Sequence, residues 1–188
     1  MTSVLVLGGA RSGKSRYAEN RLEAFCAGTG GHFAYIATAE ARDCEMAERI
    51  AHHRARRHSR WHTIEAPLDL PEAITDAVGS AEAILVDCLT LWLSNVLLAD
   101  REVGVAADGL AAAVTACPLP LVLVANEVGF GIVPENALAR RFRDEAGRLN
   151  QKLAAVADEV VLVAAGLPLV LKAPGTDRPG AGHEIQGV

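Results

Sequence analysis

Short apolar runs alternate along the chain with segments in which apolar residues recur three and four positions apart. The first pattern is typical of buried strands and the second of helices. Shorter runs at 61–65 and 167–172 are candidates for further strands, the second of them at a sheet edge. The main apolar runs predict strands at 4–7, 33–38, 83–86, 119–125 and 160–164.

Helices are predicted between most of these strands, by spacing, alanine content or a proline at the first turn. Continuous apolar strands separated by helices predict an α/β fold in which a mainly parallel sheet has helices on both faces. In such folds ligands bind at the carboxyl ends of the strands, so that edge is where functional residues are expected. The predicted helices cover 15–25, 40–56, 70–78, 89–98, 109–116 and 136–157.

The length of 188 residues and a hydrophobic content of 51% fit a single domain with a sizeable core. We expect this domain to cover residues 1–172 and the remainder, 173–188, to be a flexible tail, since it is rich in glycine and proline and lacks periodicity. No apolar run approaches the ~20 residues of a membrane span. With no signal-like segment after Met1, we expect a cytoplasmic protein.

Net charge and aromatic content argue against a nucleic-acid-binding protein. The formal charge is −5 and aromatic residues make up 4% of the chain, so neither a basic surface nor stacking rings are available in quantity. One segment, 49–62, departs from this balance with five arginines, four histidines and no acid. A positive segment in an acidic chain indicates a small polyanion as partner. The four cysteines form no CxxC pair and are expected to be reduced core thiols.

A phosphate-binding loop is predicted directly after the first strand. The segment 8–15 matches G-x-x-x-x-G-K-[ST] between a strand and a helix, which is the context that the motif requires. Its backbone N–H groups and the helix N-terminus attract phosphate, its lysine reaches the β and γ phosphates, and its serine offers a hydroxyl to Mg²⁺. The predicted phosphate contacts are Gly8, Gly9, Ala10, Arg11, Ser12, Gly13, Lys14 and Ser15.

Carboxylates follow two other predicted strands. Asp87 ends the apolar run 83–87. An acid at the end of such a strand, beside a phosphate loop, is typical of a residue that holds Mg²⁺. Taken without the phosphate loop, helix capping is the simpler role for such a residue. Asn126 and Glu127 follow the run 119–125, and Glu127 is a second candidate for metal binding or for activation of a hydroxyl. Arginines between 140 and 148 either neutralise phosphate or form ordinary surface pairs.

The two adjacent histidines of the basic segment are predicted to differ. On a helix, His53 shares an apolar stripe with Met46 and Ile50, whereas His52 lies about 120° away on the arginine-lined side. Nearby arginines disfavour the imidazolium and keep a neutral nitrogen available as nucleophile or base. A solvated basic helix face is the alternative. A zinc site from the histidines of 52–62 lacks regular ligand spacing.

Several motifs in order resemble the bifunctional cobinamide kinase and cobinamide-phosphate guanylyltransferase family of cobalamin biosynthesis. The similarity covers about residues 2–172 and rests on GGARSGKS, IAHHRARR, WHTIEAP, ILVDCLTLWLSN and NEVGFGIVPENALARRFRDEAGRLNQ. It implies two reactions. The hydroxyl of adenosylcobinamide takes a γ-phosphoryl group from ATP or GTP. A histidine then attacks the α-phosphorus of GTP and passes GMP to adenosylcobinamide phosphate.

The resemblance also implies roles for particular residues. His52 matches the nucleophilic histidine, and Lys14 the lysine of the phosphate loop. Further positions that the family uses around nucleotide and metal correspond to Thr38, Arg54, Arg57, Glu65 and Asp87. Because one phosphate loop must serve both reactions, we expect the helix at 40–57 to move between them. The family is usually oligomeric, and we expect a homo-oligomer. The apolar segment 89–98 is a candidate for a subunit contact, although a core helix is the favoured interpretation.

Two other functions fit the phosphate loop alone. One is a kinase for another small alcohol that does not use the histidine. The other is a nucleotide-dependent regulatory switch, although no [NT]KxD guanine-specifying motif occurs in the chain.

Overall fold

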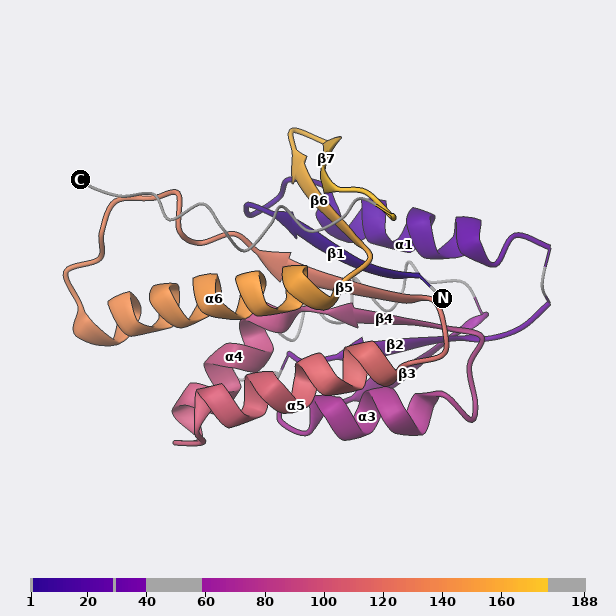
Figure 1. Cartoon of the computed structure of the whole chain (residues 1–188), viewed down its shortest axis with the longest axis horizontal. Coiled ribbons are helices and arrows are strands. Elements are labelled where there is room, and N and C mark those ends of the chain that lie inside the picture. The colour runs from indigo at the N-terminus through magenta and orange to yellow at the C-terminus, as the bar shows by residue number, and fades with distance from the viewer. Residues whose placement is uncertain (1, 29, 40–58, 176–188) are drawn as a thin grey trace.

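The computed structural model describes residues 2–28, 30–39 and 59–175. This part of the chain forms one seven-stranded sheet in the order β3-β2-β4-β5-β1-β6-β7 (Figure 1). Every neighbouring pair is parallel except β6 and β7, which form an antiparallel hairpin at one edge. The predicted α/β fold with a mainly parallel sheet is confirmed. The strands are β1 Ser3–Gly8, β2 Phe33–Ala37, β3 Trp61–Glu65, β4 Ala83–Asp87, β5 Leu121–Asn126, β6 Glu159–Ala164 and β7 Leu167–Lys172.

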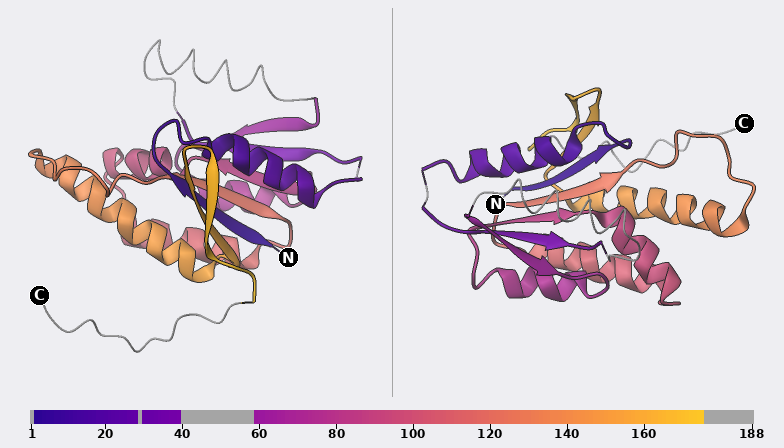
Figure 2. Two further views of the ribbon diagram at one scale, coloured as in Figure 1. Left: turned by 90° about the horizontal axis from the view of Figure 1, so that it is seen from above. Right: turned by 180° about the vertical axis from the view of Figure 1, so that it is seen from behind.

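The described helices cover both faces of the sheet unequally. Helix α1 lies on one face, and the other four lie on the opposite face (Figures 1 and 2). Their sequences explain where two of them begin: Pro71 stands in the first turn of α3, and the side chain of Asn136 caps α6 by accepting from the N–H groups of Leu138 and Ala139. The bounds are α1 Lys14–Phe25, α3 Leu70–Ala77, α4 Leu89–Leu98, α5 Val103–Ala116 and α6 Ala137–Val156.

The core consists of two apolar layers, one on each face of the sheet. Alternate residues of one strand enter different layers: Val4 and Val6 pack with α1, whereas Leu5 packs with the four helices opposite. This alternation is the two-residue period of a strand, and it explains why the central strands are apolar throughout. Trp92, Leu93 and Leu89 place α4 firmly in the larger layer, so the segment 89–98 is a core helix over most of its surface.

Several predicted boundaries were wrong by a few residues. Helix α5 begins at Val103 and not at Gly109, because Val103, Ala107, Leu110 and Val114 form a buried stripe that offsets the poor helix propensity of two glycines. Strand β5 begins two residues later than predicted and includes Asn126. The predicted helix at 40–56 and nearly all of the predicted tail lie outside the described residues, so the division at 172 stays a prediction.

The described cysteines are free thiols. Cys26 and Cys88 are buried and Cys117 is half-buried. This agrees with the expected reduced core thiols for the three cysteines within the described residues. None of the helices described here is long and apolar enough to cross a membrane.

Candidate active site

The segment 8–15 forms a tight loop between β1 and α1, as the motif predicts. Gly13 precedes the helix with a φ of 95°, which glycine adopts without strain. The N–H of Ser12 donates to the carbonyl oxygen of Gly9 (3.3 Å) and that of Tyr17 to Gly13 (3.0 Å). The buried side chain of Lys14 turns back over the loop, where its Nζ donates to the Gly9 oxygen at 3.1 Å. The loop therefore encloses the ammonium group that would meet a phosphate chain.

Gly8 is required by its surroundings and not by its backbone angle. A Cβ at this position would lie 2.5 Å from Ser12 Oγ and 2.6 Å from the carbonyl oxygen of Val163 on β6. Both distances are shorter than any normal carbon–oxygen contact, and the second involves backbone that cannot turn away. The loop thus lies directly against the neighbouring strand, and Ser12 Oγ has no hydrogen-bond partner there.

The predicted site residues at strand ends share one edge of the sheet. Ala37, the residue before Thr38, is in register with both Glu65 and Asp87, and Gly8 is in register with Asn126. Strand β5 separates β4 from β1, which puts Asp87 two strands, or about 10 Å, from the strand that leads into the phosphate loop. On the β5 side, the residues beside Gly8 are therefore Asn126 and Glu127. The N–H of Glu127 donates to the Gly8 oxygen at 3.0 Å.

Thr38 fixes the end of strand β4. It is fully buried, and its Oγ1 donates to the Cys88 carbonyl oxygen (2.7 Å) while accepting from the Cys88 N–H (2.9 Å). Asn95 on α4 in turn donates to the carbonyl oxygens of Thr38 (2.9 Å) and Pro67 (3.0 Å). Both hydrogen bonds of the Thr38 hydroxyl go to the backbone of Cys88. Thr38 thus holds Cys88, the residue next to Asp87, in position.

The pKa of the Cys88 thiol depends on its burial and on the charged groups around it. Burial raises the pKa of its thiol to about 11, and the negative charge of Asp87 adds to the rise. The N–H groups of Leu91 and Thr90 and the ammonium of Lys14 act in the opposite direction. Lys14 and Asp87 are therefore both near enough to act on this one buried thiol. A cation and a carboxylate in this arrangement suit a phosphate chain with its metal ion.

A second polar network ties α4 to the end of β5. Thr90 Oγ1 accepts from the N–H of Asn126 at 2.7 Å and lies 3.4 Å from its carbonyl oxygen, and Asn126 Nδ2 lies 3.8 Å from Cys88 Sγ. Sequence reasoning assigned no role to Thr90 or Asn95 and treated Cys88 only as a core thiol. A signal for Thr90 and Asn95 was present, because both are polar residues on a mostly apolar helix, and a buried polar side chain needs a partner.

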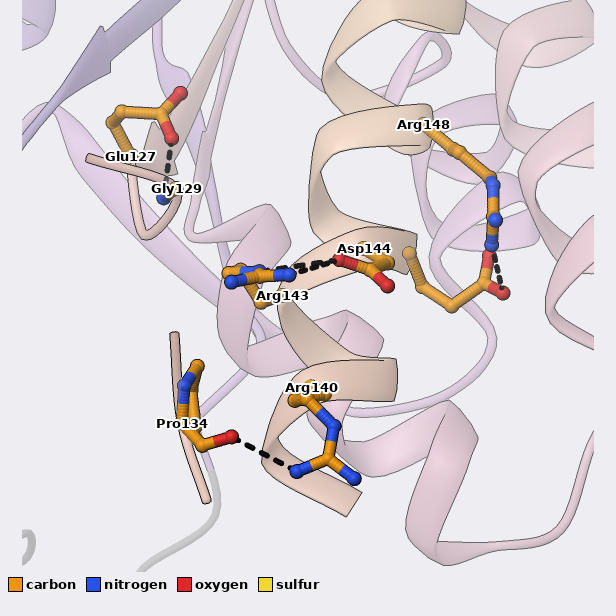
Figure 3. A network of polar contacts seen from close by, with 8 residues as sticks. Glu127, Gly129, Pro134, Arg140, Arg143, Asp144 and Arg148 are labelled. Carbon is orange, nitrogen blue, oxygen red and sulfur yellow. Dashed lines mark hydrogen bonds and ion pairs between the residues drawn. The ribbon is translucent and has the colours of Figure 1, made fainter. Parts of the chain in front are cut away.

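The loop after β5 and the arginines of α6 are drawn in Figure 3. One carboxylate oxygen of Glu127 accepts from the N–H of Gly129 at 2.7 Å, so this side chain helps to shape the loop. Arg140 donates to the carbonyl oxygens of Pro134 and Glu135.

Further along α6, Arg143 pairs with Asp144 at 2.9 Å and Arg148 with Glu145 at 2.7 Å (Figure 3). Arg143 and Arg148 thus form the ordinary ion pairs that the simpler interpretation of this helix expected, whereas Arg140 bonds to backbone carbonyl oxygens.

The remaining predicted residues lie outside the described part of the chain. These are His52, Arg54 and Arg57, together with His53. Glu65 is described, at the exposed end of β3 beside β2. The structure thus brings together the phosphate loop, Thr38, Asp87 and Glu65 along one sheet edge, and leaves the roles of the basic segment as predictions.

Comparison with protein families decides between the candidate functions of this site. The family model described as cobinamide kinase / cobinamide phosphate guanyltransferase matches residues 4–171. The chain belongs to this family. The match includes the phosphate loop, the basic segment and the loop after β5, which are the motifs on which the resemblance rested.

Relatives in three bacteria are similar over nearly their whole length. The chain is 47% identical over 172 residues to the bifunctional adenosylcobalamin biosynthesis protein CobP of Pseudomonas aeruginosa, covering 89% of this chain and 96% of that one. It is 45% identical over 184 residues to the bifunctional protein CobU of Salmonella typhimurium, covering 90% and 99%. The Escherichia coli CobU is 42% identical with the same coverage.

A solved structure supports the fold alone. The KaiC-like protein PH0186 of Pyrococcus horikoshii superposes with a TM-score of 0.53 at 15% identity, covering 86% of this chain and 70% of that one. At this level of identity the likeness concerns the arrangement of strands and helices and says nothing of the substrate.

Proposed function

We propose that this chain phosphorylates adenosylcobinamide and then transfers GMP to the product. In the first reaction the hydroxyl of the aminopropanol arm attacks the γ-phosphorus of ATP or GTP. In the second, GMP from GTP is joined to adenosylcobinamide phosphate, which gives adenosylcobinamide-GDP and pyrophosphate. The observation that carries the proposal is membership of a family named for both reactions, matched from residue 4 to residue 171 with an intact phosphate loop.

For the kinase step the described residues supply binding and charge. The N–H groups of the loop and the start of α1 surround the phosphates, and Lys14 neutralises charge on the β and γ oxygens. Lys14 is held by the Gly9 oxygen at 3.1 Å, so its ammonium is already placed over the loop before a nucleotide binds. Such placement lowers the reorganisation needed when charge develops on the transferring group.

The residues present fit a magnesium ion bound together with nucleotide. Mg²⁺ is held in such sites by one or two protein oxygens plus phosphate oxygens and water. The Ser15 hydroxyl, in the first turn of α1, and the Asp87 carboxylate, at the end of β4, are the protein oxygens that would hold it. When bound, the ion supplies neutralisation of the charge shared between phosphates.

The second reaction also needs a nucleophile that attacks the α-phosphorus. We assign this role to His52 for two reasons: it is predicted to lie on the polar side of a helix, and it matches the nucleophilic histidine of the family. A ring nitrogen of His52 attacks the α-phosphorus and pyrophosphate leaves. A phosphate oxygen of adenosylcobinamide phosphate then attacks the same phosphorus, and the imidazole leaves as the neutral base.

Guanine recognition falls to Glu65 in this proposal. Two carboxylate oxygens can accept two N–H groups from a guanine edge, and Glu65 stands at the same edge of the sheet as the phosphate loop. Arg54 and Arg57 are assigned to phosphate oxygens. Movement of the segment 40–57 between the two reactions, a homo-oligomeric assembly and a cytoplasmic location are further expectations.

The histidine step is tested with GTP labelled at the α-phosphate. Label should remain on the protein in alkali and be lost in acid, as expected of a histidine phosphoramidate. His52→Ala should abolish this labelling and spare transfer of the γ-phosphate to cobinamide. His53→Ala is the matched control and should keep the label. Loss of label in His53→Ala alone would contradict the assignment.

The same assay distinguishes the other two candidate functions. A kinase for a different small alcohol would take no α-label and would transfer γ-phosphate without dependence on cobinamide. A regulatory switch would bind or hydrolyse nucleotide and transfer nothing. Neither has an observation of its own in its favour beyond the phosphate loop.

A further inference from the structure

The loop between β5 and α6 exposes large apolar side chains. The exposed fractions are 83% for Phe130, 97% for Ile132 and 59% for Val133. Single exposed apolar residues are common on protein surfaces, but neighbouring ones mark a binding site. Here three of them lie within four positions.

The loop is held in shape at both ends. At its start, Glu127 accepts from the N–H of Gly129 (2.7 Å). At its end, Arg140 donates to the Pro134 oxygen (3.0 Å). Figure 3 shows both contacts, the second of them beside the first turn of α6. The apolar side chains are therefore presented by a backbone that is bonded to the rest of the protein.

An apolar groove lies on the helices where this loop ends, at Asn136. It has a volume of about 250 Å³ and lies between the last turn of α4 and the first turns of α6. Its walls include Leu97, Leu98, Leu138 and Phe142, with the polar Asn136 at its side. Leu98 and Leu138 are themselves 56% and 54% exposed. We call the five exposed residues Phe130, Ile132, Val133, Leu98 and Leu138 the apolar platform.

The loop that carries three of the platform residues starts beside the phosphate loop. The last residue of β5, Asn126, is in register with Gly8, and the N–H of Glu127 donates to the Gly8 oxygen at 3.0 Å. Phe130 follows only three residues later. The other exposed apolar set, at 167–171, lies on β7, which starts at the same edge but runs antiparallel, away from it. Of the two sets, the platform is the one that stays at the carboxyl edge.

We propose that the apolar platform binds one face of the corrin macrocycle of the substrate. This inference rests on the proposed function. Cobinamide is a flat macrocycle with apolar faces, a rim of amides and one arm that ends in the reacting hydroxyl. That hydroxyl must come within roughly 3 to 3.5 Å of the phosphorus, so the macrocycle lies beside the phosphate loop. An apolar surface with amide-bearing Asn136 at its side matches a face and a rim of this kind.

The platform is tested by equilibrium dialysis of cobinamide against the purified full-length protein, with the visible absorbance of the corrinoid as the readout. Phe130→Ser and Ile132→Ser should each raise the Kd for cobinamide roughly tenfold or more, since each removes a large apolar contact. Leu169→Ser, on exposed β7, is the matched control and should leave the Kd unchanged. Thermal unfolding of the three variants should coincide with that of the natural protein.

Light scattering on the same samples tests a second copy of the chain as the occupant. An unchanged mass together with the raised Kd supports the proposal. A loss of mass in either platform variant identifies a subunit contact and overturns it, as does an unchanged Kd for cobinamide. Failure of the proposed function is separate: a protein that binds cobinamide through Phe130 but transfers neither phosphate nor GMP would keep the platform and lose the reactions.

Discussion

The N–H of Gly166 donates to the carbonyl oxygen of Ser12 at 2.8 Å. The turn between β6 and β7 is thus bonded to the middle of the phosphate loop, although the two lie far apart in the sequence. Gly166 has a φ of 79° and its neighbour Ala165 one of 51°, so the turn adopts left-handed backbone to make this contact. The antiparallel hairpin at the sheet edge therefore supports the loop that binds phosphate.

This contact predicts that Gly13 tolerates no side chain. A Cβ on Gly13 would lie 3.3 Å from Gly166 Cα, and the φ of 95° disfavours any other residue. Gly13→Ala should weaken binding of a non-hydrolysable GTP analogue roughly five- to thirtyfold, because about 1–2 kcal/mol of strain falls on the loop. Calorimetric titration measures it.

Gly9→Ala is the comparison, since a Cβ there meets no protein atom within 4 Å. Its affinity for the GTP analogue should fall less than that of Gly13→Ala. Equal losses in the two variants would show that the contact with the hairpin turn is not the cause.

A pH-dependent loss of stability is predicted from Cys88. The thiol pKa is raised from 9.0 to about 11 in the folded protein. Between these values the unfolded chain loses the thiol proton and the folded chain keeps it, so the free energy of unfolding falls as pH rises from 9 to 11. The contribution is roughly 3 kcal/mol and is fully present below pH 9.

The measurement is the free energy of unfolding in urea at pH 8, 9, 10 and 11 for the natural protein and Cys88→Ala. The variant removes the titrating group while other alkaline titrations remain, so its stability should decline less steeply. Its lower stability at pH 8, from the lost packing, does not affect the comparison. Parallel curves for the two proteins would contradict the raised thiol pKa.

The sequence predicted the central sheet well because those strands are buried on both faces. A run such as Ile84–Val86 has few other places in a folded protein, and the glycines and lysine of 8–15 locate the phosphate loop between strand and helix. The start of α5 was missed since Gly104 and Gly109 mask a stripe that only packing against α3 and α6 stabilises.

The order of the strands in the sheet could not be predicted from the pattern of apolar residues. Apolar runs show that strands exist, but nothing local shows that β5 inserts between β4 and β1 and so separates Asp87 from the phosphate loop. The bonds of Thr38 to Cys88 and of Gly166 to Ser12 join residues dozens of positions apart or more. Such contacts depend on the finished fold, and they determine where the candidate site residues lie.

A partly buried ion pair between α1 and β6 predicts an asymmetric response to mutation. Arg21 Nη2 lies 2.6 Å from Glu159 Oε2, and the Glu159 side chain is 6% exposed. Arg21→Met leaves that carboxylate buried without its cation and should cost roughly 1–2 kcal/mol, discounted because the arginine is itself a third exposed.

Adding Glu159→Gln to Arg21→Met removes the uncompensated charge and should restore part of the loss. Urea unfolding of the single and double variants measures the effect. If the free energy of unfolding of the double variant falls by the sum of the losses in the two single variants, the charge pair does not act as a unit.

The carboxyl end of the long helix α6 is stabilised from β7, which predicts different roles for two lysines. Lys172 Nζ donates to the carbonyl oxygens of Ala154 (3.1 Å), Ala155 (3.3 Å) and Ala157, where helix carbonyls lack partners and the helix dipole is negative. Lys152 instead forms an exposed ion pair with Asp108. Lys172→Met should therefore lower the free energy of unfolding by about 1–2 kcal/mol, and Lys152→Met by less than about 0.5 kcal/mol.

The urea midpoints of the two lysine variants are compared at low and high salt. The loss in Lys172→Met should persist at high salt, because its bonds to carbonyl oxygens are partly buried and weakly screened, whereas any loss in Lys152→Met should vanish. Since β7 also carries the turn that contacts Ser12, a Lys172→Met protein with a loosened hairpin should bind the GTP analogue more weakly. Undiminished GTP affinity in a clearly destabilised Lys172→Met protein would show that the hairpin supports the helix end and the phosphate loop independently.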